Sequence, residues 1–201
     1  GENAGEVYIL YGGAFGGGTT PIRVTGTSVA EILMGAAGND RLAGRGGADV
    51  YRTGAGDDRI LISNAGFRLI DAGSGEHDIV VFDGTRFTLD ARKFSNGELT
   101  GIEGFDLTKG NNTLKLAAVD VFHFSTNENS LFTGAGSHNN LVVDGNKGDK
   151  LQLFDTGAAN AEWETVRFNR HLDYTFVNLV EDGTDTVLAS IAVDNDMTLV
   201  L

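Results

Sequence analysis

Acidic side chains recur every nine residues in one stretch of the chain, at Glu31, Asp40, Asp49 and Asp58. Carboxylates that stack about one strand spacing (~4.8 Å) apart repel each other unless a cation lies between them. Calcium prefers a shell of roughly six to eight oxygens, and glycine-rich turns let backbone carbonyls join the carboxylates in that shell. The residue types and their spacing therefore predict calcium sites.

Short strands joined by glycine-rich turns must position these carboxylates. Four nine-residue units cover residues 26–61, and each begins with glycine-rich residues. The eighth residue of each unit is apolar: Leu33, Leu42, Tyr51 and Ile60. Two units make one coil, so we expect stacked partners eighteen residues apart, with Glu31 over Asp49 on one edge and Asp40 over Asp58 on the other.

The nine-residue period breaks after Asp58. The next acidic position holds Phe67, which cannot bind a metal, and the one after it holds Glu76. One inserted residue would instead bring Asp78 to the acidic position and Val80 to the apolar one. A further calcium ion is therefore expected between Asp58 and either Glu76 or Asp78.

The units follow the pattern G-G-x-G-x-D-x-U-x of calcium-binding parallel β-helices. On residues 38–40, 47–49 and 56–58 (G-N-D, G-A-D and G-D-D) the chain resembles the RTX family. Together with the later phrases L-T-G-I-E-G-F-D-L and L-V-V-D-G-N-K-G-D-K-L, it resembles modules near the distal end of giant RTX adhesins of Gram-negative bacteria. The resemblance implies calcium-dependent binding of a short peptide, such as a protein C-terminus, or of a glycan on a target surface. It also implies type I secretion and an extracellular or cell-surface location.

Charge and composition narrow the class of protein. The 201 residues carry a formal charge of −13, which disfavours nucleic acid as a partner. No apolar run approaches the roughly 18 residues that span a bilayer, so membrane insertion is not expected. The chain has no cysteine, which leaves metal ions to stabilise an extracellular fold. Because the first residue is glycine, we interpret the chain as a segment of a larger protein with neighbouring domains.

The remaining sequence predicts an all-β fold. Alternating apolar residues and a single proline favour a short calcium-binding parallel β-roll merged with an antiparallel β-sandwich-like region. We expect a capping strand in residues 1–25, the roll in residues 26–83 and a β-rich ligand-binding region in residues 84–201, continuous with the roll. Residues 117–124 are the one segment that suits a helical turn, and residues 109–112 suit a turn between two strands. The last fifty residues are expected to form antiparallel strands.

The candidate sites divide into calcium ligands and a ligand-binding rim. The candidate calcium ligands are Glu31, Asp40, Asp49, Asp57, Asp58, Asp71, Glu76, Asp78, Asp144 and Asp149. The last two flank a Gly/Asn turn and could form a second class of calcium site or an ordinary Asx turn. The candidate rim consists of Asp106, Asn111, Asn112, Ser125, Asn127, Glu128 and Asn129, and a plain solvated loop is the alternative for its second half.

Catalytic motifs are missing from the sequence. The four histidines lack zinc-ligand spacing, and neither H-E-x-x-H nor G-x-S-x-G occurs. We assign His123 to a water-facing strand or helical turn and Trp163 to the core of the C-terminal sheet. The leading hypothesis is a non-enzymatic, calcium-dependent adhesin domain. The alternatives are a calcium-stapled spacer of a large secreted RTX protein and an accessory module of a secreted polysaccharide-active enzyme.

Overall fold

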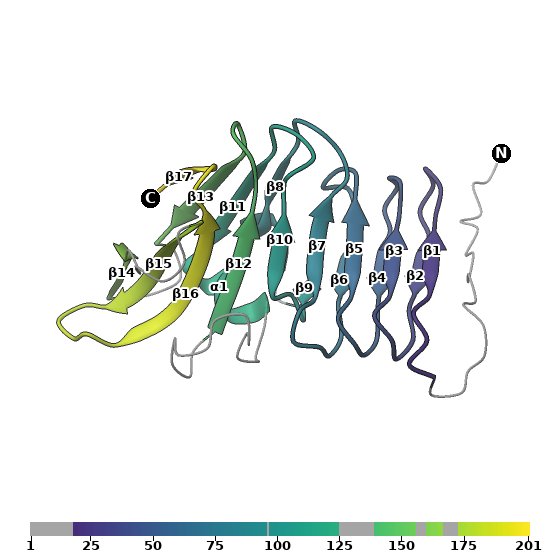
Figure 1. Ribbon diagram of the computed structural model, residues 1–201, viewed down its shortest axis with the longest axis horizontal. Helices are drawn as coiled ribbons and strands as arrows, with labels where there is room; N and C mark the ends of the chain where they lie inside the picture. The colour runs from purple at the N-terminus through teal and green to yellow at the C-terminus, as the bar shows by residue number, and fades with distance from the viewer. Residues whose placement is uncertain (1–17, 96, 125–138, 156–159, 167–172) are drawn as a thin grey trace.

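The nine-residue units form three-residue strands that stack into a solenoid (Figure 1). The computed structural model describes residues 18–95, 97–124, 139–155, 160–166 and 173–201. One parallel sheet begins with β1 (Arg23–Thr25), β3 (Arg41–Ala43) and β5 (Arg59–Ile62). A second consists of β2 (Ile32–Met34), β4 (Val50–Arg52), β6 (Leu69–Asp71) and β9 (Leu99–Thr100). The predicted register is confirmed, because Leu42 pairs with Ile60 and Leu33 with Tyr51.

The third coil is two residues longer than the first two. Tyr51 pairs with Ile70, nineteen residues on, and Ile60 pairs with Val80 of β7 (Ile79–Phe82), twenty residues on. The expectation of one inserted residue was therefore wrong: one residue is inserted before β6 and another before β7. At the lost acidic position, the buried Phe67 ring stacks on Phe94 with centroids 4.9 Å apart.

A third face is added after β7. The elements that follow are β8 (Thr88–Asp90), the 3₁₀ helix η1 (Ala91–Lys93), β10 (Gly104–Asp106), β11 (Thr113–Ala117), α1 (Ala118–Phe124), β12 (Asn139–Asp144) and β13 (Lys150–Phe154). β8, β11 and β13 form a new parallel sheet, while β10 and β12 extend the first sheet. Helix α1 lies beside β9, where the Ile102 amide donates to the Phe124 carbonyl at 2.9 Å. The predicted helical turn is thus confirmed.

Among the described strands, antiparallel pairing is confined to the C-terminal segment. β14 (Ala161–Val166), β15 (Tyr174–Glu181) and β16 (Val187–Asp194) pair antiparallel, and β16 joins β12 in parallel. The last strand, β17 (Thr198–Val200), pairs in parallel with β13. The all-β class is confirmed, but parallel pairing reaches beyond the expected roll. The turn at residues 109–112 is a corner between two sheets rather than a hairpin, because it carries the chain from β10 to β11 on different faces.

Apolar side chains fill the inside of the solenoid in columns that run across the strands. One column of the first sheet contains Leu42, Ile60, Val80, Phe105, Val143 and Val193 in register. Each buried side chain of this size contributes about 1.5–3 kcal/mol of hydrophobic free energy. Trp163 is buried in the C-terminal sheet as predicted, and its indole N–H donates to the Phe154 carbonyl at 3.4 Å. No helix in the described part of the chain is long and apolar enough to cross a membrane.

Candidate metal centre

Buried acidic side chains precede the strands on two edges of the roll. Asp40, Asp58, Asp78 and Glu103 come directly before β3, β5, β7 and β10, and we call these four residues the long carboxylate ladder. Glu31 and Asp49 come directly before β2 and β4 and form a short ladder on the other edge. All six side chains are at most 5% exposed. Carboxylates are rarely buried this deeply unless hydrogen bonds or cations compensate them.

Backbone amides hold one oxygen of each carboxylate in place. In the long ladder the Asp40 amide donates to Asp58 Oδ1 at 2.7 Å, and the Asp58 amide donates to Asp78 Oδ1 at 2.7 Å. The Asp78 amide donates to Glu103 Oε2 at 2.9 Å. In the short ladder the Glu31 amide donates to Asp49 Oδ1 at 3.0 Å. Each acidic residue therefore binds the preceding coil, and the two edges predicted from the eighteen-residue spacing are confirmed.

Other oxygens of the long ladder lack such donors. Asp58 Oδ2 and Asp78 Oδ2 are buried and have no hydrogen-bond partner. Burial and, to a smaller extent, the neighbouring Glu103 carboxylate raise the pKa of Asp78 to about 8, against the opposing effect of the Asp58 amide. Burial likewise raises the pKa of Asp58 to about 6 and that of Asp49 to about 6. Two buried carboxylates on adjacent coils thus carry uncompensated negative charge when they ionise.

Glycines leave space between these oxygens and the backbone carbonyls. A Cβ atom on Gly75 would lie 2.4 Å from the Gly56 carbonyl oxygen and 3.0 Å from Asp78 Oδ2. At Gly35, a Cβ atom would lie 2.1 Å from the carbonyl oxygen of Thr53 and 2.6 Å from a carboxylate oxygen of the ladder. A carbonyl oxygen and a carboxylate oxygen therefore approach the same point at both turns, and only glycine fits there.

This arrangement fits a hard cation such as calcium. Asp58 and Asp78, together with the carbonyl of Gly56, would hold an ion between the second and third coils, where it would neutralise the two carboxylates. Within the described residues, no three histidine, aspartate or glutamate side chains converge on one point. Backbone carbonyls must therefore supply much of the oxygen shell, which is what calcium accepts from turns.

Three other predicted ligands of the roll lie outside the ladders. Asp57 is partly exposed; it accepts the Glu76 amide at 3.3 Å and lies 3.7 Å from His77 Nδ1. Glu76 is exposed, because the longer third coil places Asp78, and not Glu76, in register with Asp58. Asp71 is half-buried within β6. Of the two alternatives for the third acidic position, the structure selects Asp78.

The other two predicted ligands, Asp144 and Asp149, differ in burial and in hydrogen-bond partners. Asp144 is half-buried at the end of β12 and accepts the Tyr174 hydroxyl at 2.6 Å. Asp149 is 1% exposed, and its two oxygens accept the amides of Asn112 at 2.7 Å and Asn146 at 2.8 Å. Asp149 thus joins two turns, whereas Asp144 lies on the outward face of the first sheet.

The predicted ligand-binding rim does not form a continuous surface in the described residues. Asn111 is exposed, but Asn112 is fully buried and repeats the ladder geometry on the third edge. Its Oδ1 accepts the Phe87 amide at 3.2 Å, and its Nδ2 donates to the Gly84 and Leu107 carbonyls at 3.2 and 3.4 Å. The assignment of Asn112 to a rim was therefore wrong.

Of the remaining members of the predicted rim, the structure describes the surroundings of Asp106. Asp106 forms an ion pair with Arg59 at 2.9 Å and accepts the Thr108 hydroxyl at 2.6 Å. Ser125, Asn127, Glu128 and Asn129 lie outside the described residues.

Glu103 is the member of the long ladder that sequence reasoning missed. It lies twenty-five residues after Asp78, so no period of nine or eighteen reaches it. A local signal is nevertheless present. Glu103 precedes the inward Phe105 by two residues, just as Asp78 precedes Val80.

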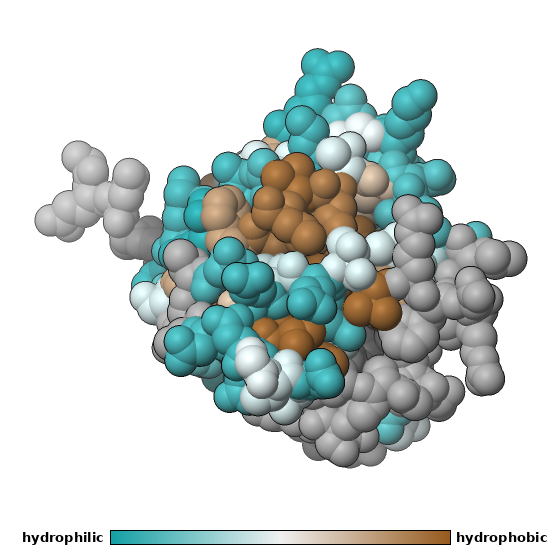
Figure 2. Space-filling view, turned by 90° about the vertical axis from the view of Figure 1, so that its left-hand side faces the viewer, coloured by the Kyte–Doolittle hydropathy of each residue, from teal (hydrophilic) through white to brown (hydrophobic). Residues whose placement is uncertain are grey.

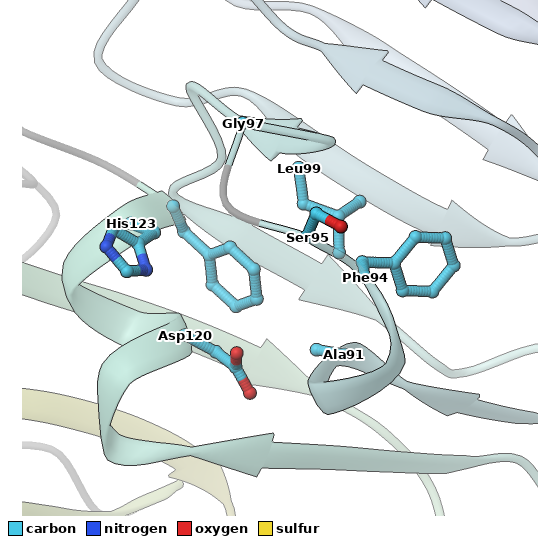
Figure 3. Close-up of a pocket in the computed structure, with 8 residues that line it drawn as sticks. Ala91, Phe94, Ser95, Gly97, Leu99, Asp120 and His123 are labelled. Atoms are coloured by element: carbon cyan, nitrogen blue, oxygen red, sulfur yellow. The ribbon is translucent and has the colours of Figure 1, made fainter. Parts of the chain in front are cut away.

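A small cavity lies between α1 and the segment around η1 (Figure 3). Its volume of about 10 Å³ suits a single water molecule. Asp120 and His123 reach it from α1, opposite Phe94 and Leu99. Asp120 Oδ2 accepts the Ala117 amide at 2.7 Å, and burial raises the pKa of this carboxyl above its ordinary value. These contacts fix the start of the helix, and half-buried His123 borders the cavity rather than facing only water.

Comparison with known families matches residues 25–60 to the RTX calcium-binding nonapeptide repeat, in four copies. The matched segment ends at Ile60, whereas the carboxylate ladder continues to Asp78 and Glu103. RTX nonapeptide repeats typically bind calcium, in agreement with the buried acidic ladder. Neither a curated protein nor a solved structure matched the chain.

Proposed function

We propose that this chain is a calcium-dependent structural and adhesive module of a secreted RTX-type protein. One observation carries the structural part of the proposal. Adjacent coils place Asp58 Oδ2 and Asp78 Oδ2 in the interior without a hydrogen-bond partner, on an edge that begins within the RTX repeats. Calcium bound there converts a mutual repulsion between coils into a bridge. The ion is then part of the folding free energy of the roll.

Secretion follows from this coupling of calcium to folding. A chain that needs calcium for its ladders stays unfolded where calcium is scarce and folds where it is plentiful. The RTX repeats are typical of secreted proteins, and export by type I secretion to the cell surface or medium is the route that we propose. The chain has no cysteine, which agrees with a fold that calcium ions, rather than disulfides, stabilise.

An adhesive role is favoured by the C-terminal end of the solenoid. Figure 2 shows apolar side chains gathered on this end of the molecule. A groove of about 480 Å³ there is lined by Gln152, Leu153, Phe154, Asp155, Val200 and Leu201. Val200 and Leu201 are 41% and 55% exposed, and β17 is the edge strand of its sheet. An extended peptide could add to such an edge through main-chain hydrogen bonds, so a peptide is the ligand that this end favours over a glycan.

Calcium titration followed by far-UV circular dichroism and calorimetry tests the structural part. We expect a gain of β structure and a large rise in melting temperature on addition of calcium, both reversed by a chelator. A chain that is equally folded with and without calcium would refute it. The adhesive part is tested by titrating peptide libraries with free C-termini into the calcium-loaded protein. Failure to bind any of them, or binding that survives the substitution Leu201→Asp, would count against it.

A further inference from the structure

Asp49 and Asp58 occupy equivalent positions on the two edges of the roll. Asp49 is the second acid of the short ladder and Asp58 the second acid of the long ladder, and both are at most 1% exposed. Oδ1 of each accepts the amide of the acid one coil earlier, from Glu31 at 3.0 Å and from Asp40 at 2.7 Å. The two carboxylates therefore form a matched pair, and a difference at Oδ2 reflects the residues around it.

The two Oδ2 atoms have different surroundings. Asp49 Oδ2 accepts the Tyr51 hydroxyl at 3.4 Å, whereas Asp58 Oδ2 is buried without a hydrogen-bond partner. The difference comes from the inward residue two positions after each acid, which is Tyr51 in β4 and Ile60 in β5. An isoleucine side chain has no polar atom, so it leaves the carboxylate of the long ladder uncompensated.

The Tyr51 hydroxyl lies inside the turn, between two coils. It is 3.4 Å from the carbonyl oxygen of Leu61, one coil further on. A Cβ atom on Gly44 would lie 2.0 Å from this hydroxyl and 2.3 Å from Asp49 Oδ2. On the long edge, a Cβ atom on Gly35 would instead meet a backbone carbonyl beside the carboxylate. A carbonyl oxygen only accepts, so its approach to a carboxylate calls for a cation, whereas a hydroxyl can donate to the carboxylate.

The next coil explains why a donor is sufficient at Asp49. Phe67 lies where the short ladder would place its third acid, and its buried ring stacks on Phe94. Asp78 fills the corresponding position of the long ladder. A cation beyond Asp49 would therefore have no second carboxylate to share. A hydroxyl donor stabilises this single buried carboxylate without adding a buried positive charge.

We propose that the Tyr51 hydroxyl takes the place of a calcium ion at Asp49, so that calcium holds the second and third coils together on the long edge only. The inference rests on the proposed function, because the ion between Asp58 and Asp78 is its reference. One edge of this step is closed by the chain itself, and the other edge is closed by the ion.

The one-sided load agrees with the different lengths of the two sheets. Figure 1 shows the first sheet continuing from β7 through β10, β12 and β16, whereas the second sheet ends at β9. The long ladder precedes the strands of the first sheet, and the short ladder precedes those of the second. Calcium therefore joins the starts of β5 and β7, in the sheet that leads to the C-terminal end of the solenoid. Removing the ion loosens this edge while the turn before β4 stays closed.

Counting the bound calcium ions in two variants tests the proposal. Equilibrium dialysis of the whole chain should find as many ions in Asp49→Asn as in the wild type, and one fewer in Asp58→Asn. Asparagine is nearly isosteric with aspartate and keeps the Oδ1 acceptor for the preceding coil, and circular dichroism in calcium checks that both variants fold. One ion fewer in Asp49→Asn would overturn the proposal and leave the proposed function intact. An unchanged count in Asp58→Asn would refute the ion site of the proposed function, and the inference with it.

Tyr51→Phe distinguishes a hydrogen-bond donor from a calcium ligand. The substitution keeps the buried ring and leaves Asp49 Oδ2 without its donor. Chemical unfolding should show an unfolding equilibrium constant about tenfold larger in chelator, and a change in calcium that is no greater. A larger loss in calcium than in chelator would make the hydroxyl a ligand of the ion and overturn the proposal. Tyr174→Phe is the matched control, because its hydroxyl donates to half-buried Asp144, outside both ladders, and its effect should be the same in both conditions.

Discussion

Asparagine in place of Asp78 should have opposite effects with and without calcium. Asp78 Oδ1 accepts the Asp58 amide at 2.7 Å, and an asparagine carbonyl oxygen can keep that bond. Asp78 Oδ2 is buried without a partner, so the substitution removes a buried charge together with a calcium ligand. The new amide group would lie near the Gly56 carbonyl, which can accept its hydrogen bond. Asp78→Asn should therefore stabilise the calcium-free fold and destabilise the calcium-bound one.

The magnitude follows from the raised pKa of Asp78. A shift from 3.8 to about 8 corresponds to at most about 6 kcal/mol for keeping this carboxylate ionised in the calcium-free fold. The folded-state pKa lies above the unfolded one, so this cost is absent below about pH 4 and complete above about pH 8. Partial opening of the turn relieves some of it, and we expect a gain of about 2–3 kcal/mol at pH 8 without calcium.

Chemical unfolding at about pH 8, followed by circular dichroism in calcium and in chelator, measures both effects. Asp71→Asn is the matched control, because Asp71 is half-buried in β6 and outside both ladders. It should change stability by less than about 0.5 kcal/mol in either condition. If Asp78→Asn destabilised the protein equally with and without calcium, Asp78 would be only a hydrogen-bond acceptor and the ion site would be refuted.

Three further predictions concern the ladders and turns. Without calcium, the melting temperature should rise as the pH falls from about 8 to about 5, because the folded ladder binds protons more tightly than the unfolded chain. Thermal melts measured across this pH interval would show no change if hydrogen bonds already compensated the carboxylates. Gly73→Ala should destabilise the roll more than Gly183→Ala. Both glycines have a positive φ, but only a Cβ atom on Gly73 would meet a carbonyl oxygen, at 1.9 Å. Equal melting temperatures of the two variants would contradict the tight stacking of turns. Asn112→Ala should cost about 2–3 kcal/mol in calcium and in chelator alike, because it removes the hydrogen bonds of a fully buried side chain and leaves the part-buried Phe87 amide without its acceptor. A calcium-dependent loss in the same unfolding assay would instead place an ion on the third edge.

Local spacing predicted the two-sided roll well because its register is set by short-range repetition. Each nine-residue unit returns an acidic residue to the same edge, so Asp40 over Asp58 follows from counting. Counting in steps of nine residues failed after residue 61, where the coils are longer. Phe67 took an acidic position by packing on Phe94, which comes twenty-seven residues later and gives no periodic signal.

The later coils were the hardest part to predict from the sequence. The alternation of apolar and polar residues in β10 and β11 is the same for a hairpin and for two faces of a solenoid. The partner of β10 is β7, and the partner of β11 is β8, so the choice depends on contacts with the preceding coil. Asn112 became a buried ladder residue for the same reason, because its donor is the amide of Phe87 one coil earlier.

The sequence by itself determined the acidic, glycine-rich repeat of residues 26–61, the all-β class and the inward apolar columns, because these depend on periodicity within short stretches of the chain. Tertiary structure alone decided that Asp78 and Glu103 extend the ladder and that a third face follows β7. It also decided that Arg59 and Asp106 lie close enough to form an ion pair across β7. Those features join residues from coils of different lengths, and only the pairing of one coil on the next brings them into register.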